Sequence, residues 1–207
     1  MQLKIINLEP KRRNTILNAA LKEFSMKGFD DASTNVIAKE AGISKGLMFH
    51  YINSKEDLFL FLYDYCTERI NNEYLDLMNF NEKDIFKRLR QSYKLQIDLL
   101  QQHPWIFDFI KITDMTNSVE INKKLEKEVA KKLARCHDEM FDIVDEAKFR
   151  EGLNLERCKQ VIFWTNVGFT NQILGDIRHT KITQLDYDKI QADLDSYLNE
   201  LEAIFYR

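Results

Sequence analysis

Glycine and proline are scarce in this sequence of 207 residues, with 6 and 2 copies respectively. Because these residues supply tight turns and interrupt helices, their scarcity argues against a sheet with many turns and favours long helices. Hydrophobic residues make up 44% of the chain, which is enough for a packed core. We therefore expect an all-α globular protein.

Cysteine and long apolar runs are also scarce. The three cysteines are odd in number and widely spaced, which argues against a disulfide framework or a clustered metal site and fits a reducing cytoplasm. Polar and charged residues interrupt the first ten positions, so we expect no signal peptide core there. No apolar run approaches the ~20 residues needed to cross a bilayer. We expect a cytoplasmic protein with no membrane partner.

Charge of either sign is not in large excess, since the formal net charge is -3. The first 60 residues hold 9 Lys and Arg against 7 Asp and Glu, a net of +2, which leaves 21 against 26, a net of -5, for the rest. This difference fits a small DNA-facing end on an acidic body.

Residues 33–44 have the pattern of a helix followed by a tight turn. Ser33 or Thr34 can cap a short helix, and the spacing of the apolar residues after them predicts a buried stripe that includes Val36. Gly42 can adopt the positive φ that ends this helix.

A second short helix is expected from Lys45 to Ile52. Ser44 can cap it, and it is short and exposed enough to lie in a DNA major groove. Ser54 and Asp57 then form a variant of the capping box at the start of a long helix that runs to about Leu77. This stretch is therefore interpreted as a helix-turn-helix and its support helix.

An ordered set of motifs runs through this region: Gly28-Phe29, Ser33-Thr34, Val36-Ile37-Ala38, Ala41-Gly42-Ile43-Ser44-Lys45-Gly46, His50-Tyr51 and Ser54-Lys55-Glu56-Asp57-Leu58. In this set the chain resembles the tetracycline-repressor-like (TetR) family of bacterial transcription regulators, over roughly its first third. Leu47 stands where the family commonly has Thr, and Phe49 where it commonly has Tyr. Two hydroxyls that often contact phosphate are therefore absent, and we expect Phe49 to belong to the core.

The resemblance implies a double-stranded DNA operator as partner. Lys45 and Asn35 would contact bases, and Gly46 would let the backbone approach the DNA closely. Phosphate contacts would come from four residues: Thr34, His50, Tyr51 and Lys55. Lys55 is also consistent with a plain surface charge at a helix start. The basic cluster at residues 11–13 fits either a DNA contact or a solvated helix start.

Helical spacing continues along the rest of the chain and predicts helices over residues 10–28, 81–103, 105–110, 118–150, 154–173 and 186–206. Asn81 is expected to cap the second of these. We expect a DNA-binding domain over residues 1–54 and a helical ligand-binding and dimerisation domain over 55–207, with a support helix over 55–77 that joins them.

The resemblance also implies a small-molecule effector and a homodimer. Aromatic and polar residues occur together in the helical domain, and such a mixture would suit a mostly apolar ligand. For any single one of them, a place in an ordinary helical core is the better explanation. The ligand candidates are His103, Trp105, Phe109, Met115, His137, Met140, Phe141, Trp164, Phe169 and Gln172. Apolar stripes on both sides of the last two helices need a cover, which a two-fold dimer would provide. The dimer candidates are Val161, Val167, Tyr197, Leu201 and Phe205.

Catalytic, metal and cofactor sites are not expected. The sequence has no Gly-rich phosphate loop and no His-Glu-x-x-His motif. Cys136, His137 and Asp138 are adjacent and would point in different directions on a helix. We expect a regulator, most often a repressor that a ligand releases from a palindromic operator. An activator, a ligand-independent regulator and a helical ligand-binding or scaffolding protein that has lost DNA affinity are the alternatives.

Overall fold

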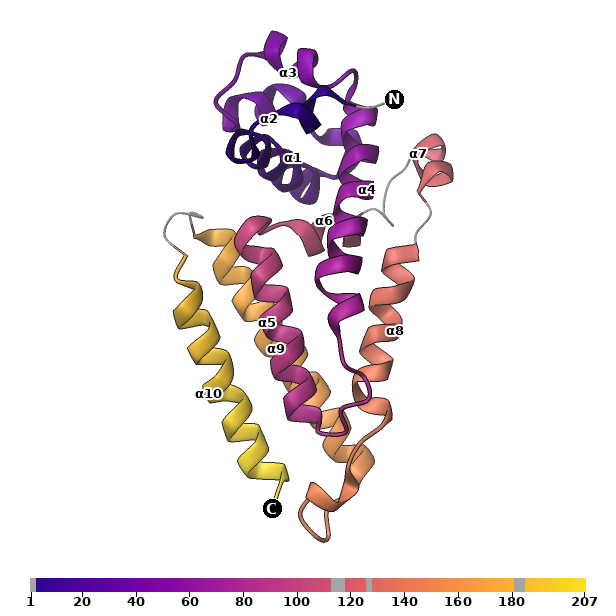
Figure 1. The fold of residues 1–207 in the computed structure, drawn as a ribbon, viewed down its shortest axis with the longest axis vertical. Helices are drawn as coiled ribbons and strands as arrows, with labels where there is room; N and C mark the ends of the chain where they lie inside the picture. Colours follow the sequence, from indigo (N-terminus) through magenta and orange to yellow (C-terminus); the bar gives the residue numbers. More distant parts are fainter. Residues whose placement is uncertain (1–2, 113–117, 126–127, 181–184) are drawn as a thin grey trace. The chain divides into compact units, whose positions relative to one another are not determined.

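The computed structural model describes residues 3–112, 118–125, 128–180 and 185–207, and within these ranges the chain is helical (Figure 1). An isolated antiparallel bridge joins Phe149 and Tyr206. The expected all-α class is confirmed. None of the helices in the described ranges is both long and apolar enough to cross a membrane.

The chain divides into two compact units, which are described separately. One consists of residues 1–73 with 102–132, and the other of residues 74–101 with 133–207. The elements in chain order are η1 (Lys4–Asn7), α1 (Pro10–Asp31), α2 (Thr34–Glu40), α3 (Lys45–Tyr51), α4 (Lys55–Glu73), η2 (Leu75–Leu77), α5 (Ile85–Gln102), α6 (Ile106–Ile112), α7 (Val119–Lys124), α8 (Glu128–Asp142), η4 (Glu146–Lys148), α9 (Leu155–His179) and α10 (Tyr187–Phe205).

An aromatic cluster holds the first unit together. The ring of Phe59 on α4 lies edge-on to Phe24 of α1 at 5.0 Å, to Phe29 at 5.2 Å and to Phe109 of α6 at 5.1 Å between centroids. Phe24, Phe59 and Phe109 are fully buried. Gly28, with a φ of 72°, interrupts α1 just before Phe29, so the chain turns there and Phe29 reaches the same cluster.

Helix α5 contributes the polar contacts that link the helices of the second unit. The Tyr93 hydroxyl donates to Asn166 Oδ1 of α9 at 2.6 Å, and Arg90 donates to Glu202 of α10 at 2.7 Å. The buried guanidinium of Arg88 donates to two carbonyls at the end of α8. These bonds cross-link α5 to three other helices, and the charge of Arg88 complements the negative end of the α8 dipole.

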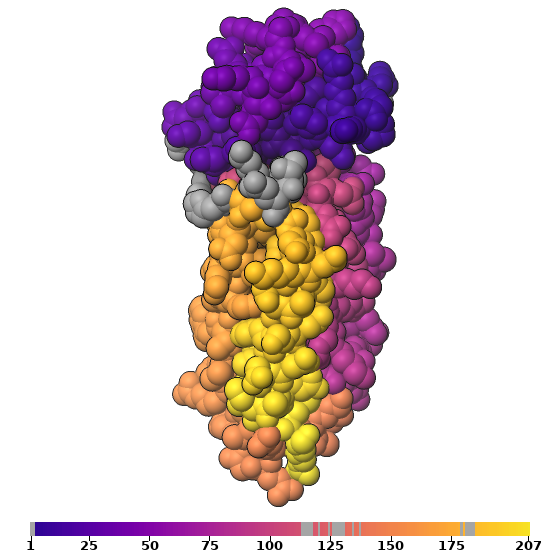
Figure 2. Space-filling model, turned by 90° about the vertical axis from the view of Figure 1, so that its left-hand side faces the viewer, coloured from indigo at the N-terminus to yellow at the C-terminus, as the bar shows by residue number. Residues whose placement is uncertain are grey.

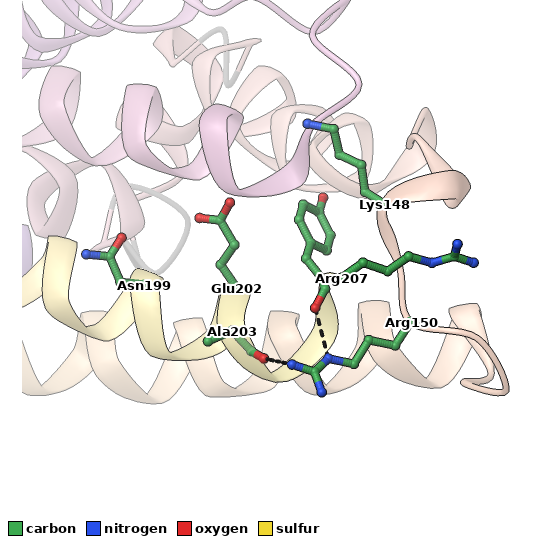
Figure 3. Close-up of a pocket in the computed structure, with 7 residues that line it drawn as sticks. Lys148, Arg150, Asn199, Glu202, Ala203 and Arg207 are labelled. Carbon is green, nitrogen blue, oxygen red and sulfur yellow. Dashed lines mark hydrogen bonds between the residues drawn. The ribbon is translucent and has the colours of Figure 1, made fainter.

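A shallow hollow lies at the end of the second unit (Figure 3), lined by Lys148, Arg150, Asn199, Glu202, Ala203, Tyr206 and Arg207. Its basic residues hold the chain end in place. Arg150 donates from Nε to the Tyr206 carbonyl at 2.9 Å and from Nη2 to the Ala203 carbonyl at 2.6 Å, and so caps α10. Lys148 forms an ion pair with Asp84 at 2.6 Å. The cations of the hollow are therefore structural.

Several predicted helix ends are confirmed and others are wrong. Helices α9 and α10 begin where predicted, next to Asn154 and Asp186, each of which accepts from a backbone N–H three residues on. The single helix predicted over residues 118–150 is instead two helices, α7 and α8, and α8 ends at Asp142. The support helix ends at Glu73, short of the expected residue 77.

The predicted cap at Asn81 is also wrong. Helix α5 begins at Ile85, and Asp84 Oδ1 accepts from the backbone N–H groups of Phe86 at 3.0 Å and Lys87 at 3.3 Å. Asn81 lies in the turn that precedes the helix, where its N–H donates to the side chain of Asn79. A carboxylate both accepts these bonds and complements the helix dipole, which favours Asp84 as the start.

The aromatic cluster predicts a large stability effect at its centre. Phe59→Ala should reduce the free energy of unfolding by about 3–5 kcal/mol, because it opens a cavity against three rings. Urea denaturation measures this value. Phe49→Ala is the matched control, since Phe49 is 40% exposed and its truncation should change stability by less than ~0.5 kcal/mol. Equal effects of the two substitutions would contradict the central role of Phe59.

Candidate nucleic-acid interface

The turn between α2 and α3 is set by Gly42. Its φ is 66°, its N–H donates to the Lys39 carbonyl at 3.1 Å, and the N–H of Ile43 donates to the Ala38 carbonyl at 2.9 Å. This pair of bonds is the Schellman motif, which needs a residue with positive φ after the helix. The predicted role of Gly42 is confirmed. Ser33 stands at the N-cap of α2, but its side chain makes no capping bond.

Capping and burial fix the orientation of α3. Ser44 Oγ accepts from the Leu47 N–H at 3.2 Å, as predicted. Met48 and Ile52 are fully buried and lie four residues apart, so they define the inward face of the segment. Lys45 and Phe49, also four residues apart, lie on the outward face.

The outward surface of α2 and α3 carries four of the predicted DNA contacts, namely Asn35, Lys45, Gly46 and His50, all exposed. Thr34 and Tyr51 are half-buried at its edge. Two expectations are corrected, because Phe49 and Val36 were assigned to the core and are 40% and 46% exposed. Lys39 is exposed on α2 and was missed. Met48 and Ile52 are apolar and four residues apart. Assigning them to the buried face would have placed Phe49 on the exposed face.

Lys55 has a structural role that its predicted phosphate contact did not anticipate. Its Nζ donates to the carbonyl of Asp30 at 2.9 Å and to that of Ala32 at 3.1 Å, and it lies 4.8 Å from the centroid of the Phe29 ring. It therefore ties the start of α4 to the end of α1 and satisfies carbonyls left open there. The ammonium group of Lys55 is therefore engaged in contacts within the first unit.

The basic cluster at the start of α1 is divided. Lys11 and Arg12 are exposed, whereas Arg13 Nη1 donates to the Ile6 carbonyl at 3.4 Å and holds η1. Pro10 occupies the first turn of α1, where its missing N–H costs nothing. Lys11 and Arg12 are the cations of this cluster that remain available to a phosphate.

His103, proposed from the sequence as a ligand contact, is instead the centre of a buried network in the first unit. It is fully buried, with Nε2 2.8 Å from the Tyr65 hydroxyl of α4 and Nδ1 2.8 Å from Asn18 Oδ1 of α1. The Asn18 amide donates to the Gln102 carbonyl at 2.8 Å. His103 thereby links α1 and α4 to the segment between α5 and α6.

The same bonds assign the protons. Because the Asn18 amide nitrogen is committed to a carbonyl, its oxygen faces the imidazole, so His103 Nδ1 carries the hydrogen and Nε2 accepts from Tyr65. Burial, together with the positive charges of Arg69 and Arg13, lowers the pKa of His103 to about 4. His103 is therefore neutral at pH 7.

The other ligand candidates are placed as follows in the first unit. Phe109 belongs to the aromatic cluster, and Trp105 is half-buried. Met115 lies outside the described residues, as does the side chain of His137, which belongs to the second unit.

In the second unit, Met140 is buried and Phe141 packs edge-on to Phe163 at 5.9 Å between centroids. Phe169 stacks on Tyr197 at 4.1 Å. Trp164 and Gln172 are exposed on the surface of α9, which corrects their assignment to a pocket, since they lie on the helix face opposite buried Ile162 and Leu174. Within the described residues, no group of three or more His, Cys, Asp and Glu side chains could hold a metal ion.

The dimer candidates also divide by burial. Val161 is 48% exposed, and Val167 and Tyr197 are half-buried. Leu201 and Phe205 are buried in the chain itself, so their predicted contact with a second copy is corrected: α10 turns this stripe toward the core of its own unit. The exposed apolar groups on α9 are Val161 and Trp164.

Comparisons with known proteins agree with this geometry. Residues 16–62 match the family model of bacterial regulatory proteins, tetR family. The chain is 29% identical over 124 residues to the uncharacterized HTH-type transcriptional regulator YuxN of Bacillus subtilis, covering 59% of this chain and 40% of that protein. It is 33% identical over 93 residues to YdgC, another uncharacterized HTH-type regulator of B. subtilis, covering 44% of this chain and 48% of that protein. The matches thus span less than half the length of these relatives.

Solved structures share the fold over nearly the whole chain. A TetR family regulator from Chloroflexus aurantiacus aligns with a TM-score of 0.55 and 16% identity, over 98% of this chain and 97% of that one. The ketosteroid transcriptional regulator KstR2 of Mycobacterium tuberculosis aligns with a TM-score of 0.57 and 16% identity, over 95% of each chain. Fold and turn geometry together define an all-α helix-turn-helix protein. Over residues 16–62 the chain is similar to the tetR family of bacterial regulatory proteins.

The low pKa of His103 predicts a pH dependence of stability. An unfolded His binds a proton near pH 6.5 and the folded one only near pH 4, so the free energy of unfolding falls as pH drops between these values. From pH 7 to 5.5 the loss should be about 1 kcal/mol. Urea denaturation at both pH values measures it. His103→Gln should remove this loss, while His50→Gln, at an exposed position, should retain it; an unchanged loss in His103→Gln would contradict the assignment.

Proposed function

We propose that this chain is a DNA-binding transcriptional regulator that binds a palindromic operator as a homodimer and is released by a small, mostly apolar effector. Its activity is binding, without catalysis. We favour repression as the form of regulation. In this mechanism the unliganded protein occupies the operator and ligand binding removes it.

The outward surface of α2 and α3 is the observation that supports DNA binding. Lys39 and Lys45 add positive charge there, and Asn35 and His50 add hydrogen-bonding groups. Lys45 stands at the first position of α3, and the first residues of a recognition helix are those that reach base edges. An amine at that position suits the O6 and N7 acceptors of guanine, and the amide of Asn35 suits adenine or phosphate.

The exposed apolar residues of α9 support a homodimer. In the second unit α9 and α10 run side by side along one face (Figure 2). Trp164 is 67% exposed and Val161, three residues earlier on the same face, is 48% exposed. Gly168, one turn further on, leaves the backbone open to close approach. A two-fold contact would bury these residues against their own copies.

The effector site is proposed for the second unit, near Met140, Phe141 and Phe169. Phe141 and Phe169 are half-buried and offer apolar surface, and the Tyr93, Asn166 and Thr170 groups offer polar contacts between α5 and α9. A ligand that binds there and prefers one arrangement of the helices would shift the spacing of the two DNA-binding heads in a dimer. Release of labelled DNA by members of an apolar compound panel tests this part of the proposal.

Fluorescence anisotropy on DNA from upstream of the gene, against scrambled DNA, tests the proposed function. Binding should be selective and should weaken steeply as salt rises, since phosphate neutralisation releases counterions. Lys45→Ala should reduce affinity by about 1–3 kcal/mol and relax selectivity at one base pair. Tyr51→Ala should weaken binding to all sequences alike. Wild-type affinity in both folded variants would contradict the interface.

Sedimentation velocity tests the homodimer. The wild-type protein should sediment as a dimer at micromolar concentration, and Trp164→Lys should shift it toward monomer because it places two like charges in the contact. Met26→Lys, at an exposed apolar residue of α1 in the first unit, is the control and should leave the dimer in place. A monomeric wild-type protein would overturn this step.

A further inference from the structure

Phe49 is the exposed aromatic residue of the proposed recognition segment. It lies on the same face as Lys45, four residues earlier, while Met48 and Ile52 fill the inward face. Phe49 is 40% exposed, in a segment of seven residues that the fold otherwise anchors through buried neighbours. Leaving apolar surface in contact with water has a hydrophobic cost, and packing within the chain does not explain why Phe49 is left exposed.

The neighbours of Phe49 leave space over its side. Helical side chains lean toward the preceding turn, which places the Phe49 ring over positions 45 and 46. Position 46 is glycine, and apart from its two chain neighbours and the helix backbone no atom lies within 4 Å of where a Cβ would stand there. The ring is therefore free to lie along the outward surface beside Lys45.

We propose that Phe49 reads thymine by apolar contact of its ring with the C5 methyl group in the major groove. This inference rests on the proposed DNA binding and names a base that the site selects. A phenyl ring has no hydrogen-bond donor for a phosphate, so the phosphate role of a tyrosine at this position is closed to it. Among the base edges exposed in the major groove, the thymine methyl is the apolar one.

The position of that thymine follows from the helix geometry. Phe49 and Lys45 are about one turn apart, which is ~5.4 Å along the helix, and successive bases on a strand are ~3.4 Å apart. The thymine should therefore lie within about two base pairs of the base that Lys45 contacts, once in each half-site.

Deoxyuridine substitution tests the contact because it removes only the methyl group. An operator selected from random DNA is resynthesised with each thymine replaced in turn, and affinity is measured by anisotropy. Wild-type protein should lose about three- to fivefold in affinity per half-site at one symmetric position, as expected for one apolar group returned to water. Phe49→Ala should bind thymine and deoxyuridine operators equally, so that the double-mutant cycle assigns the loss to this pair.

Phe49→Leu is the conservative variant and should retain part of the preference for thymine, which a purely structural role of the ring would not predict. Thermal unfolding of each variant checks that it is folded. If Phe49→Ala is not folded, Phe49→Leu takes its place in the double-mutant cycle. Equal binding of thymine and deoxyuridine at every position by wild type, or a full preference in folded Phe49→Ala, would overturn the inference. Failure of the proposed function would appear earlier and differently, as no selective binding to any unsubstituted DNA.

Discussion

The edge-on packing of Phe59 against Phe24, Phe29 and Phe109 is the interaction on which the first unit depends. It joins α1, α4 and α6, and the surface that faces outward on α2 and α3 is displayed from that base. An aromatic cluster suits this purpose because rings bury a large apolar area with few rotatable bonds. The turn at Gly28 contributes to this packing, because it brings Phe29 back to the ring of Phe59.

Polar groups close to this cluster complete the same framework. Lys55 ties α4 to the end of α1 through two carbonyls, and His103 joins α1 and α4 through two hydrogen bonds of 2.8 Å. A buried polar group that loses its partner costs about 1–3 kcal/mol, so each bond also fixes the arrangement in which it is satisfied.

Much of the fold could be predicted from the sequence because its signals are local. Helical spacing, the glycine at position 42 and the cap at Ser44 depend on neighbours within a few residues. The division of residues 118–150 into two helices and the burial of Leu201 depend on tertiary partners and were predicted incorrectly. The start of α5 was also predicted incorrectly, although its cap at Asp84 is local. The same limit applies to the site: exposure of Lys45 and His50 followed from the motif, whereas the bonds of Lys55 and His103 join residues 23 to 85 positions apart.

The absence of two hydroxyls at Leu47 and Phe49 bears on the choice between a DNA-binding protein and one that has lost DNA affinity. A hydroxyl that contacts phosphate contributes a neutral hydrogen bond, worth about 0.5–1.5 kcal/mol, and releases no counterion. The affinity of such interfaces for DNA comes largely from cations, and here Lys39 and Lys45 are exposed on the outward surface of α2 and α3, with Lys11 and Arg12 exposed at the start of α1. Losing the hydroxyls therefore removes a minor share of the affinity. At position 49 the ring is kept and only the hydroxyl is lost, so a phosphate contact is removed while the apolar surface of the side chain stays.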